Sequence, residues 1–167
     1  MVVANVVLTS LLAAAAIAAA ILAWHNLIIL RRQLKLNMYL SLLRELSEGE
    51  ARKNRDLVFT ELDPNKPNLQ AIKDNIIEEF TLKNRSEVRH INEAVEETIA
   101  RLDRVGFFLL RGDPSLKDEA PEWIWTITSQ MWKRAEWYVR YRKQSHKGYA
   151  KHFEELAREA LQRGFNV

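Results

Sequence analysis

The feature that most constrains this chain is an apolar stretch without charge at its start, from Val2 to Ala23. Its polar residues are only Asn5, Thr9 and Ser10. As a helix, these 22 residues would extend for roughly 33 Å, and the hydrocarbon core of a bilayer is about 30 Å thick. We therefore expect a transmembrane anchor over residues 1–30.

A cleaved secretion signal is the alternative interpretation of the same stretch. Such a signal normally carries a basic segment before a shorter apolar core, whereas "MVVANVV" has no Lys or Arg. The small residues of "AAAAIAAA" would nevertheless suit a cleavage site. The positive charge follows the apolar run, at Arg31, Arg32 and Lys35. The positive-inside rule then predicts a single pass through the inner (plasma) membrane, with the N-terminus outside and the remainder cytoplasmic.

Two features of the predicted span suggest contacts. Ala15 and Ala19 belong to an alanine-rich surface that allows close helix approach in lipid, so we expect the span to pack on its own copy or on a membrane protein partner. Trp24 and His25 fall at interfacial depth and, with the three basic residues, are expected to lie at the membrane interface. His25 as an axial haem or pigment ligand would need a second ligand or a cofactor pocket, which the sequence does not show, so no cofactor is expected.

The rest of the chain is typical of an all-α protein. It has 5 Gly, 4 Pro and no Cys, and its apolar residues recur with helical spacing. We expect a juxtamembrane helix over residues 31–46 that continues the span, then a cytoplasmic helical domain over residues 47–167 folded as an irregular bundle. Its helices are predicted at about 50–62, 69–82, 86–111, 121–143 and 149–163, with a loop over "RGDPSLKDEAP".

The helix at 86–111 carries the strongest core pattern. Its apolar residues follow one another at intervals of three or four, a spacing that places them on one face, and they are Ile91, Val95, Ile99, Leu102, Val105 and Leu109. "GFFLL" at 106–110 is expected to extend this core. Asp103, beside the stripe, would need a cationic partner there, and we predict a structural ion pair with Arg134 or Arg140.

The sequence offers no constellation of catalytic residues. It has no G-x-S-x-G motif, no phosphate-binding G-x-x-x-x-G-K motif and no Cys nucleophile. Glu87 and His90 form one E-x-x-H element, but a carboxylate-bridged metal site requires two such elements. We therefore expect neither an enzyme nor a metal site.

The segment around 123–151 is rich in tryptophan and basic residues. Exposed Trp and Arg are frequent at protein interfaces, and Trp also favours the lipid headgroup zone. We predict partner or lipid contacts at Trp123, Trp125, Trp132, Trp137, Arg140, Arg142, Lys143 and Lys147. Anionic lipid is one interpretation of this basic run and an ordinary solvated face is the other. With a net charge of +3 for the whole chain, nucleic acid binding is not indicated.

The order of these segments resembles a family of bacterial membrane-anchored helical proteins catalogued as domain of unknown function 4760. The resemblance rests on "ILRRQLKLNMYLSLLREL", "SEGEARKNRDLVF", "NEAVEETIARLDRVGFFLLRGD" and "WKRAEWYVRYRKQSHKGYAKHFEELA". In this comparison Asp103 occupies the family's single acidic position in the apolar helix, and Gly112 occupies its turn. The resemblance implies a helical cytoplasmic domain on a single span, with no catalytic residues to carry over.

We expect from the sequence a non-enzymatic, single-pass membrane protein that serves as a scaffold or accessory subunit of a membrane complex. The alternative is a membrane-tethered sensor or effector, of the stress or phage defence type, that oligomerises when it recognises a ligand.

Overall fold

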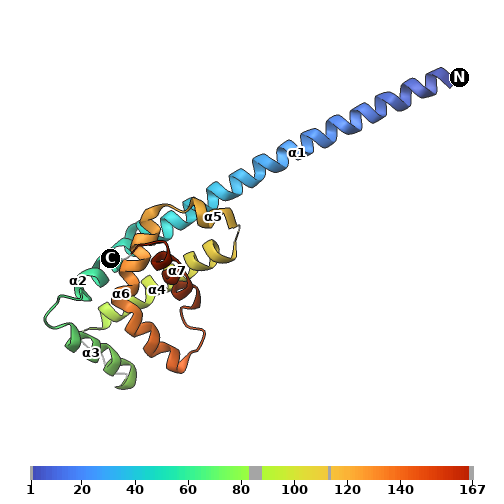
Figure 1. The fold of residues 1–167 in the computed structure, drawn as a ribbon. Coiled ribbons are helices and arrows are strands. Elements are labelled where there is room, and N and C mark those ends of the chain that lie inside the picture. The colour runs from blue at the N-terminus through green and yellow to red at the C-terminus, as the bar shows by residue number, and fades with distance from the viewer. Residues whose placement is uncertain (1, 83–87, 113, 166–167) are drawn as a thin grey trace. The chain divides into compact units, whose positions relative to one another are not determined.

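The computed structural model describes residues 2–82, 88–112 and 114–165, and over these ranges it contains α-helices and no strand (Figure 1). The all-α class predicted from the sequence is confirmed. The helices are α1 (Val2–Ser47), α2 (Gly49–Glu61), α3 (Leu69–Leu82), α4 (Arg89–Arg111), α5 (Pro114–Glu119), α6 (Glu122–Ser145) and α7 (Lys151–Gln162).

The chain divides into two units, Met1–Ser41 and Leu42–Val167. The first consists of α1 residues. The second, which we call the helical domain, begins with the last turns of α1 and contains all later helices. Helix α1 has no break after Arg32, as the sequence predicted, and it ends at Ser47. Gly49, with a φ of +53°, begins α2 in the left-handed conformation that glycine adopts at little cost.

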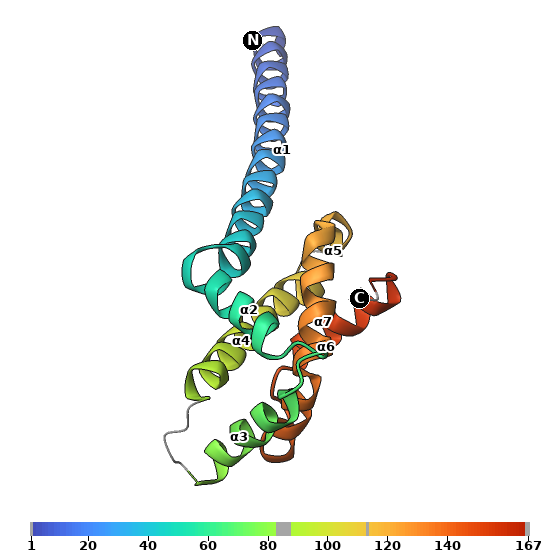
Figure 2. The ribbon, with the colours of Figure 1, turned by 90° about the vertical axis from the view of Figure 1, so that its left-hand side faces the viewer.

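Helix α4 forms the centre of the helical domain. It packs against α2, α3, α5 and α7, and α6 packs against α2 and α7. In two views, α3 lies at one end of the domain and α5 at the other, with α4 running between them (Figures 1 and 2). The core stripe predicted for α4 is confirmed, because its six residues are all buried: Ile91, Val95, Ile99, Leu102, Val105 and Leu109.

Helix α5 is a departure from the predicted loop. The segment is too short to show helical periodicity in the sequence, yet Leu116 is fully buried there. Two ion pairs hold this helix against the C-terminal segment, Lys117 Nζ to Glu159 at 2.8 Å and Arg163 to Asp118 at 3.1 Å. The sequence predicted a loop here because Pro114 cannot continue the preceding helix. In the structure the segment forms its own short helix, which buries Leu116 and makes these ion pairs.

Candidate functional site: the end of α1 and two faces of α4

Helix α1 is exposed over residues 12–34 within the described chain. Its residues Leu12–Lys35 have a mean hydropathy of 2.0, and none of this window is buried within the structure. The predicted contact residues Ala15, Ala19, Trp24 and His25 are all exposed, as are Arg31 and Arg32, while Lys35 is half-buried. By length and composition, α1 can cross a membrane.

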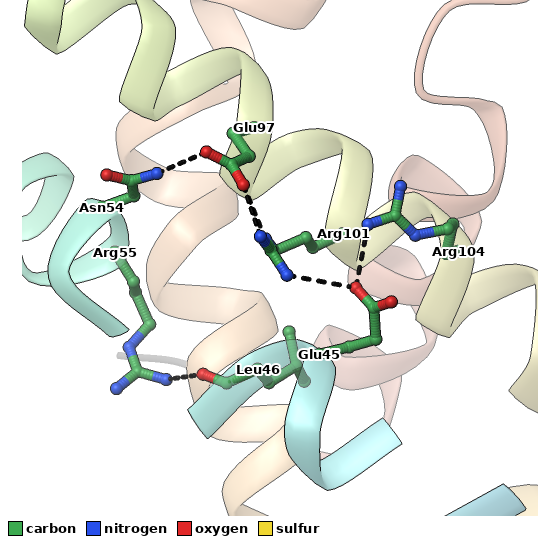
Figure 3. A network of polar contacts seen from close by, with 7 residues as sticks. All are labelled: Glu45, Leu46, Asn54, Arg55, Glu97, Arg101 and Arg104. Atoms are coloured by element: carbon green, nitrogen blue, oxygen red, sulfur yellow. Dashed lines mark hydrogen bonds and ion pairs between the residues drawn. The ribbon is translucent and has the colours of Figure 1, made fainter. Parts of the chain in front are cut away.

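The last turns of α1, within the helical domain, are fastened by a polar network to α2 and α4 (Figure 3). The carboxylate of Glu45 accepts hydrogen bonds from Arg101 at 3.4 Å and from Arg104 at 2.8 Å. Arg101 also pairs with Glu97, one turn earlier on α4. Glu97 in turn accepts a hydrogen bond of 2.5 Å from Asn54 of α2.

A second contact closes the end of α1. Arg55 of α2 donates a 2.5 Å hydrogen bond to the backbone carbonyl of Leu46, one of the last carbonyls of α1 that have no partner within the helix. The side chain of Leu46 is 3% exposed, so it anchors the same turn in the core. Apolar burial, charge pairing and capping therefore all act on one turn of α1.

The neighbouring face of α4 performs a different task, which is to cap α7. One carboxylate oxygen of Asp103 accepts the backbone N–H groups of His152 at 2.8 Å and Phe153 at 2.9 Å. The N-cap residue of α7 is Ala150, which has no polar side chain and lies in the left-handed region with a φ of 50°. Asp103 is far from α7 in the sequence but lies beside it in the fold. Its carboxylate thus provides the hydrogen-bond acceptor and the negative charge that stabilise a helix N-terminus.

Gly106, one turn after Asp103, lets the two helices meet. A Cβ atom at this position would lie 2.4 Å from the carbonyl oxygen of His152, closer than carbon and oxygen can approach. The cap at Asp103 and the close backbone contact at Gly106 both depend on the start of α7. Together they fix where α7 lies on α4.

The predicted ion pair of Asp103 with Arg134 or Arg140 is wrong. The half-buried Asp103 carboxylate accepts hydrogen bonds from backbone amides instead of a cation. Arg140 pairs with Glu136 at 2.6 Å on its own helix. Arg134 donates to the Gln130 carbonyl at 3.0 Å, and its guanidinium lies 4.7 Å from the ring centroid of Phe59.

A cluster of polar aromatic residues joins α4 to α6. The hydroxyl of Tyr138, fully buried, donates a 2.9 Å hydrogen bond to Asn92. Arg142 pairs with Glu96, and its guanidinium lies 5.1 Å from the ring centroid of Tyr149. Burial, reinforced by the negative charge of Glu96, raises the pKa of Tyr149 to about 12, and burial also raises the pKa of Tyr138.

A pocket of about 410 Å³ opens beside this cluster. Its walls come from α4, α6 and the segment before α7, and its lining residues are Glu96, Ile99, Ala100, Asp103, Arg142, Tyr149 and Ala150. The charges in it are engaged by partners in the protein, since Glu96 pairs with Arg142 and Asp103 caps α7. The pocket can therefore offer hydrogen bonds to a small polar molecule, but its described lining holds no activated nucleophile.

Of the four tryptophans predicted as contact residues, one is buried and three are half-buried. Trp125 is 2% exposed, so that prediction is wrong for it: α6 packs on both α2 and α7, and the wider buried face includes this position. Trp123, Trp132 and Trp137 are half-buried. Trp132 contacts Phe153 with 5.5 Å between ring centroids, and the Trp137 indole donates to the Arg134 carbonyl at 2.7 Å.

The basic run is less positive than its sequence suggests. Lys143 pairs with Glu154 of α7, Arg142 with Glu96 and Arg140 with Glu136. Lys147 is exposed. Glu96 and Glu154 lie outside the run and neutralise part of its charge, which a charge count over residues 133–151 does not reveal.

Two groups of residues were not recognised in the sequence. The Glu45 network was missed, although the Glu97 and Arg101 pair has the four-residue spacing of a helical ion pair. Phe107 and Phe108 were expected in the core but are 49% and 39% exposed.

For metals, the described residues contain no group of three potential ligands, and Glu87 of the E-x-x-H element lies outside them.

No protein-family model, no curated protein and no solved structure matches this chain. The resemblance to domain of unknown function 4760 therefore stays a prediction.

Proposed function

We propose that this chain is a single-pass membrane protein whose helical domain serves as a non-enzymatic scaffold or accessory subunit of a membrane complex. The observation that carries the proposal is the apolar stretch Leu12–Lys35, none of which is buried in the structure. An apolar helix in the interior of a soluble protein would be largely covered by its neighbours. A helix with this composition and no cover needs lipid, or another helix in lipid.

The network at the end of α1 supports a helical connection between the predicted anchor and the domain, because α1 is unbroken from Val2 to Ser47 and its last turn is held within the domain. Glu45, Leu46 and Arg55 fasten the last turn of α1 by charge, burial and capping. A passive tether would need only a flexible linker. The basic residues Arg31, Arg32 and Lys35 favour a cytoplasmic domain at the inner membrane, with Trp24 and His25 at the interface.

The first test is whether the chain stays in the membrane with α1 intact. Full-length protein should remain in the membrane fraction after alkaline carbonate extraction, and its intact mass should include residues 1–30. A mature protein that starts after the alanine run would instead establish a cleaved signal and refute the anchor.

The second test concerns association through the span. Ala15→Leu with Ala19→Leu should weaken co-purification of a partner or a second copy from mild detergent, because both changes enlarge a surface of small residues. Ile17→Leu with Ile21→Leu is the matched control, since it keeps the side-chain volume. Equal association of both variants would contradict packing through the alanine surface.

A membrane-tethered sensor or effector is the second candidate, and the pocket of about 410 Å³ favours it. Helix α4 lines this pocket with Glu96, Ala100 and Asp103, and it holds α1 with the adjacent residues Glu97, Arg101 and Arg104. A ligand in the pocket would therefore contact the helix that holds the last turn of α1 within the domain. Oligomerisation that depends on an added small molecule would favour this function, and constitutive association would favour the scaffold.

A further inference from the structure

The C-terminal part of α4 presents an aromatic pair to the outside of the domain. Phe107 and Phe108 are 49% and 39% exposed, and their rings meet edge to face with 5.7 Å between centroids. The Phe107 ring also contacts His152 at 5.3 Å, which fixes its place on the surface. Among the described residues of the domain, Leu161 is the other large apolar side chain with comparable exposure. Among the described side chains of the domain, this pair is therefore the place where two exposed large apolar residues adjoin.

Basic residues border the aromatic pair on the same face of α4. Arg104 precedes Phe107 by three residues and Arg111 follows Phe108 by three, so all four lie along one side of the helix. The side chains of Arg104 and Arg111 are 52% and 50% exposed. Each pairs with one acid, Glu45 or Glu155, but a guanidinium has five N–H donors and retains some for phosphate.

This arrangement is typical of a surface that lies in the boundary between lipid headgroups and acyl chains. There, aromatic rings enter the apolar layer while arginines extend to the phosphates. The covalent connection to α1 keeps any such surface near a bilayer, because the domain begins at Leu42 and the candidate span ends at Lys35. We propose that the Phe107–Phe108 face, with Arg104 and Arg111, docks on the bilayer that holds α1, an inference that rests on the proposed membrane anchor.

The natural chain has no cysteine, so single-cysteine spin labels report one position each. Full-length protein would carry a label at Phe107→Cys, at Ile17→Cys within the span or at Asp74→Cys as an exposed control. Each would be reconstituted in phosphatidylcholine vesicles with and without phosphatidylglycerol. We expect labels 17 and 107 to be severalfold more accessible to oxygen, relative to a water-soluble nickel chelate, than label 74. The effect at 107 should be larger with phosphatidylglycerol.

The outcomes separate this inference from the proposed function. If label 17 is in lipid but label 107 matches label 74, the anchor stands and the docking face is refuted. If label 17 is in water, both are refuted. Spin–spin broadening at 107 that disappears on dilution with unlabelled protein would show that a second copy covers the face, which also overturns the inference.

A second variant measures the face without a label in it. With the label at Lys151→Cys, next to His152, Phe107→Ser with Phe108→Ser should remove its proximity to lipid. Leu161→Ser, which removes an exposed apolar side chain elsewhere, should leave it unchanged. Equal lipid proximity in both variants would refute a role for the phenylalanines. Circular dichroism on each variant checks that the domain is folded.

Discussion

Replacing Asp103 by alanine should destabilise the helical domain, because the start of α7 would lose its cap. Two backbone amides, those of His152 and Phe153, donate to one oxygen of this carboxylate. The local N-cap residue, Ala150, has no side chain that could replace it. The amides would be left without an acceptor in a half-buried site.

The size of the effect follows from these contacts. Hydrogen bonds to a charged group contribute roughly 1.5–3 kcal/mol each, and replacing an N-cap by alanine costs about 0.5–2 kcal/mol. The two bonds share one oxygen, and Asp103 is partly exposed to water, so they do not add in full. We expect Asp103→Ala to lower the free energy of unfolding by about 2 kcal/mol and the Tm by roughly 6–10 °C. Asp103→Asn keeps an oxygen acceptor and should cost about half as much.

The assay is urea and thermal unfolding of the full-length chain in mild detergent, followed by tryptophan fluorescence. Trp125 is fully buried in the domain and therefore reports its unfolding. Asp74→Ala is the matched control, since Asp74 is exposed and accepts one hydrogen bond from Gln70. If Asp103→Ala has the same free energy of unfolding and Tm as Asp74→Ala, the capping role is refuted. A coupling energy above about 1 kcal/mol between Asp103→Ala and Arg140→Ala would instead support the ion pair that the structure excludes.

Three further predictions follow from other contacts. Gly106→Ala should lower the Tm by several degrees, because the new Cβ meets the His152 carbonyl oxygen at 2.4 Å and overpacking costs about 1–3 kcal/mol; an unchanged Tm would contradict the close contact. Glu45→Ala should cost about 1 kcal/mol in unfolding experiments and speed amide hydrogen exchange in residues 42–47, because Arg101 loses its partner on α1; exchange equal to that of wild type would show that the network does not hold α1. Burial raises the pKa of Tyr149 from 10.0 to about 12, so this phenol stabilises the fold fully below pH 10, and the contribution is lost as the pH rises towards 12. Tyr149→Phe should remove that loss and the corresponding phenolate absorbance, and an unchanged pH profile would contradict the assignment.

The regular parts of the fold could be predicted because they depend on local patterns. The apolar stripe of α4 has helical spacing, and its residues from Ile91 to Leu109 are buried as expected. Helix α1 continues past Arg32 because the sequence contains no Gly or Pro until Gly49. Both features need only the chain's own periodicity.

The contacts between helices could not be predicted in the same way. The sequence indicates that Asp103 needs a partner, but backbone amides are present at every residue, so only the tertiary fold selects those of residues 152 and 153. The contact predicted for Trp125 rests on a core that covers a single face of α6. In the structure α6 packs against both α2 and α7, and Trp125 is buried. Phe107 and Phe108 are exposed because they lie off the buried face of α4 that Val105 and Leu109 mark, and the hydrophobicity of "GFFLL" alone does not distinguish these positions.

The contacts on the two faces of α4 require a fixed number of residues within this helix. Glu97, Arg101 and Arg104 hold the end of α1, while Asp103 and Gly106 position α7, and the two sets are interleaved along the same turns. Deleting one residue between 97 and 101 would rotate everything beyond it by about 100° relative to what precedes it. Glu97 would then face a different direction from Arg101 and Arg104, so the network that holds the end of α1 would be broken. Asp103 and Gly106 would rotate with the later part of α4, and the position of α7 would change with them. Relatives of this chain should therefore vary in the loops around α4 and keep the number of residues within it constant.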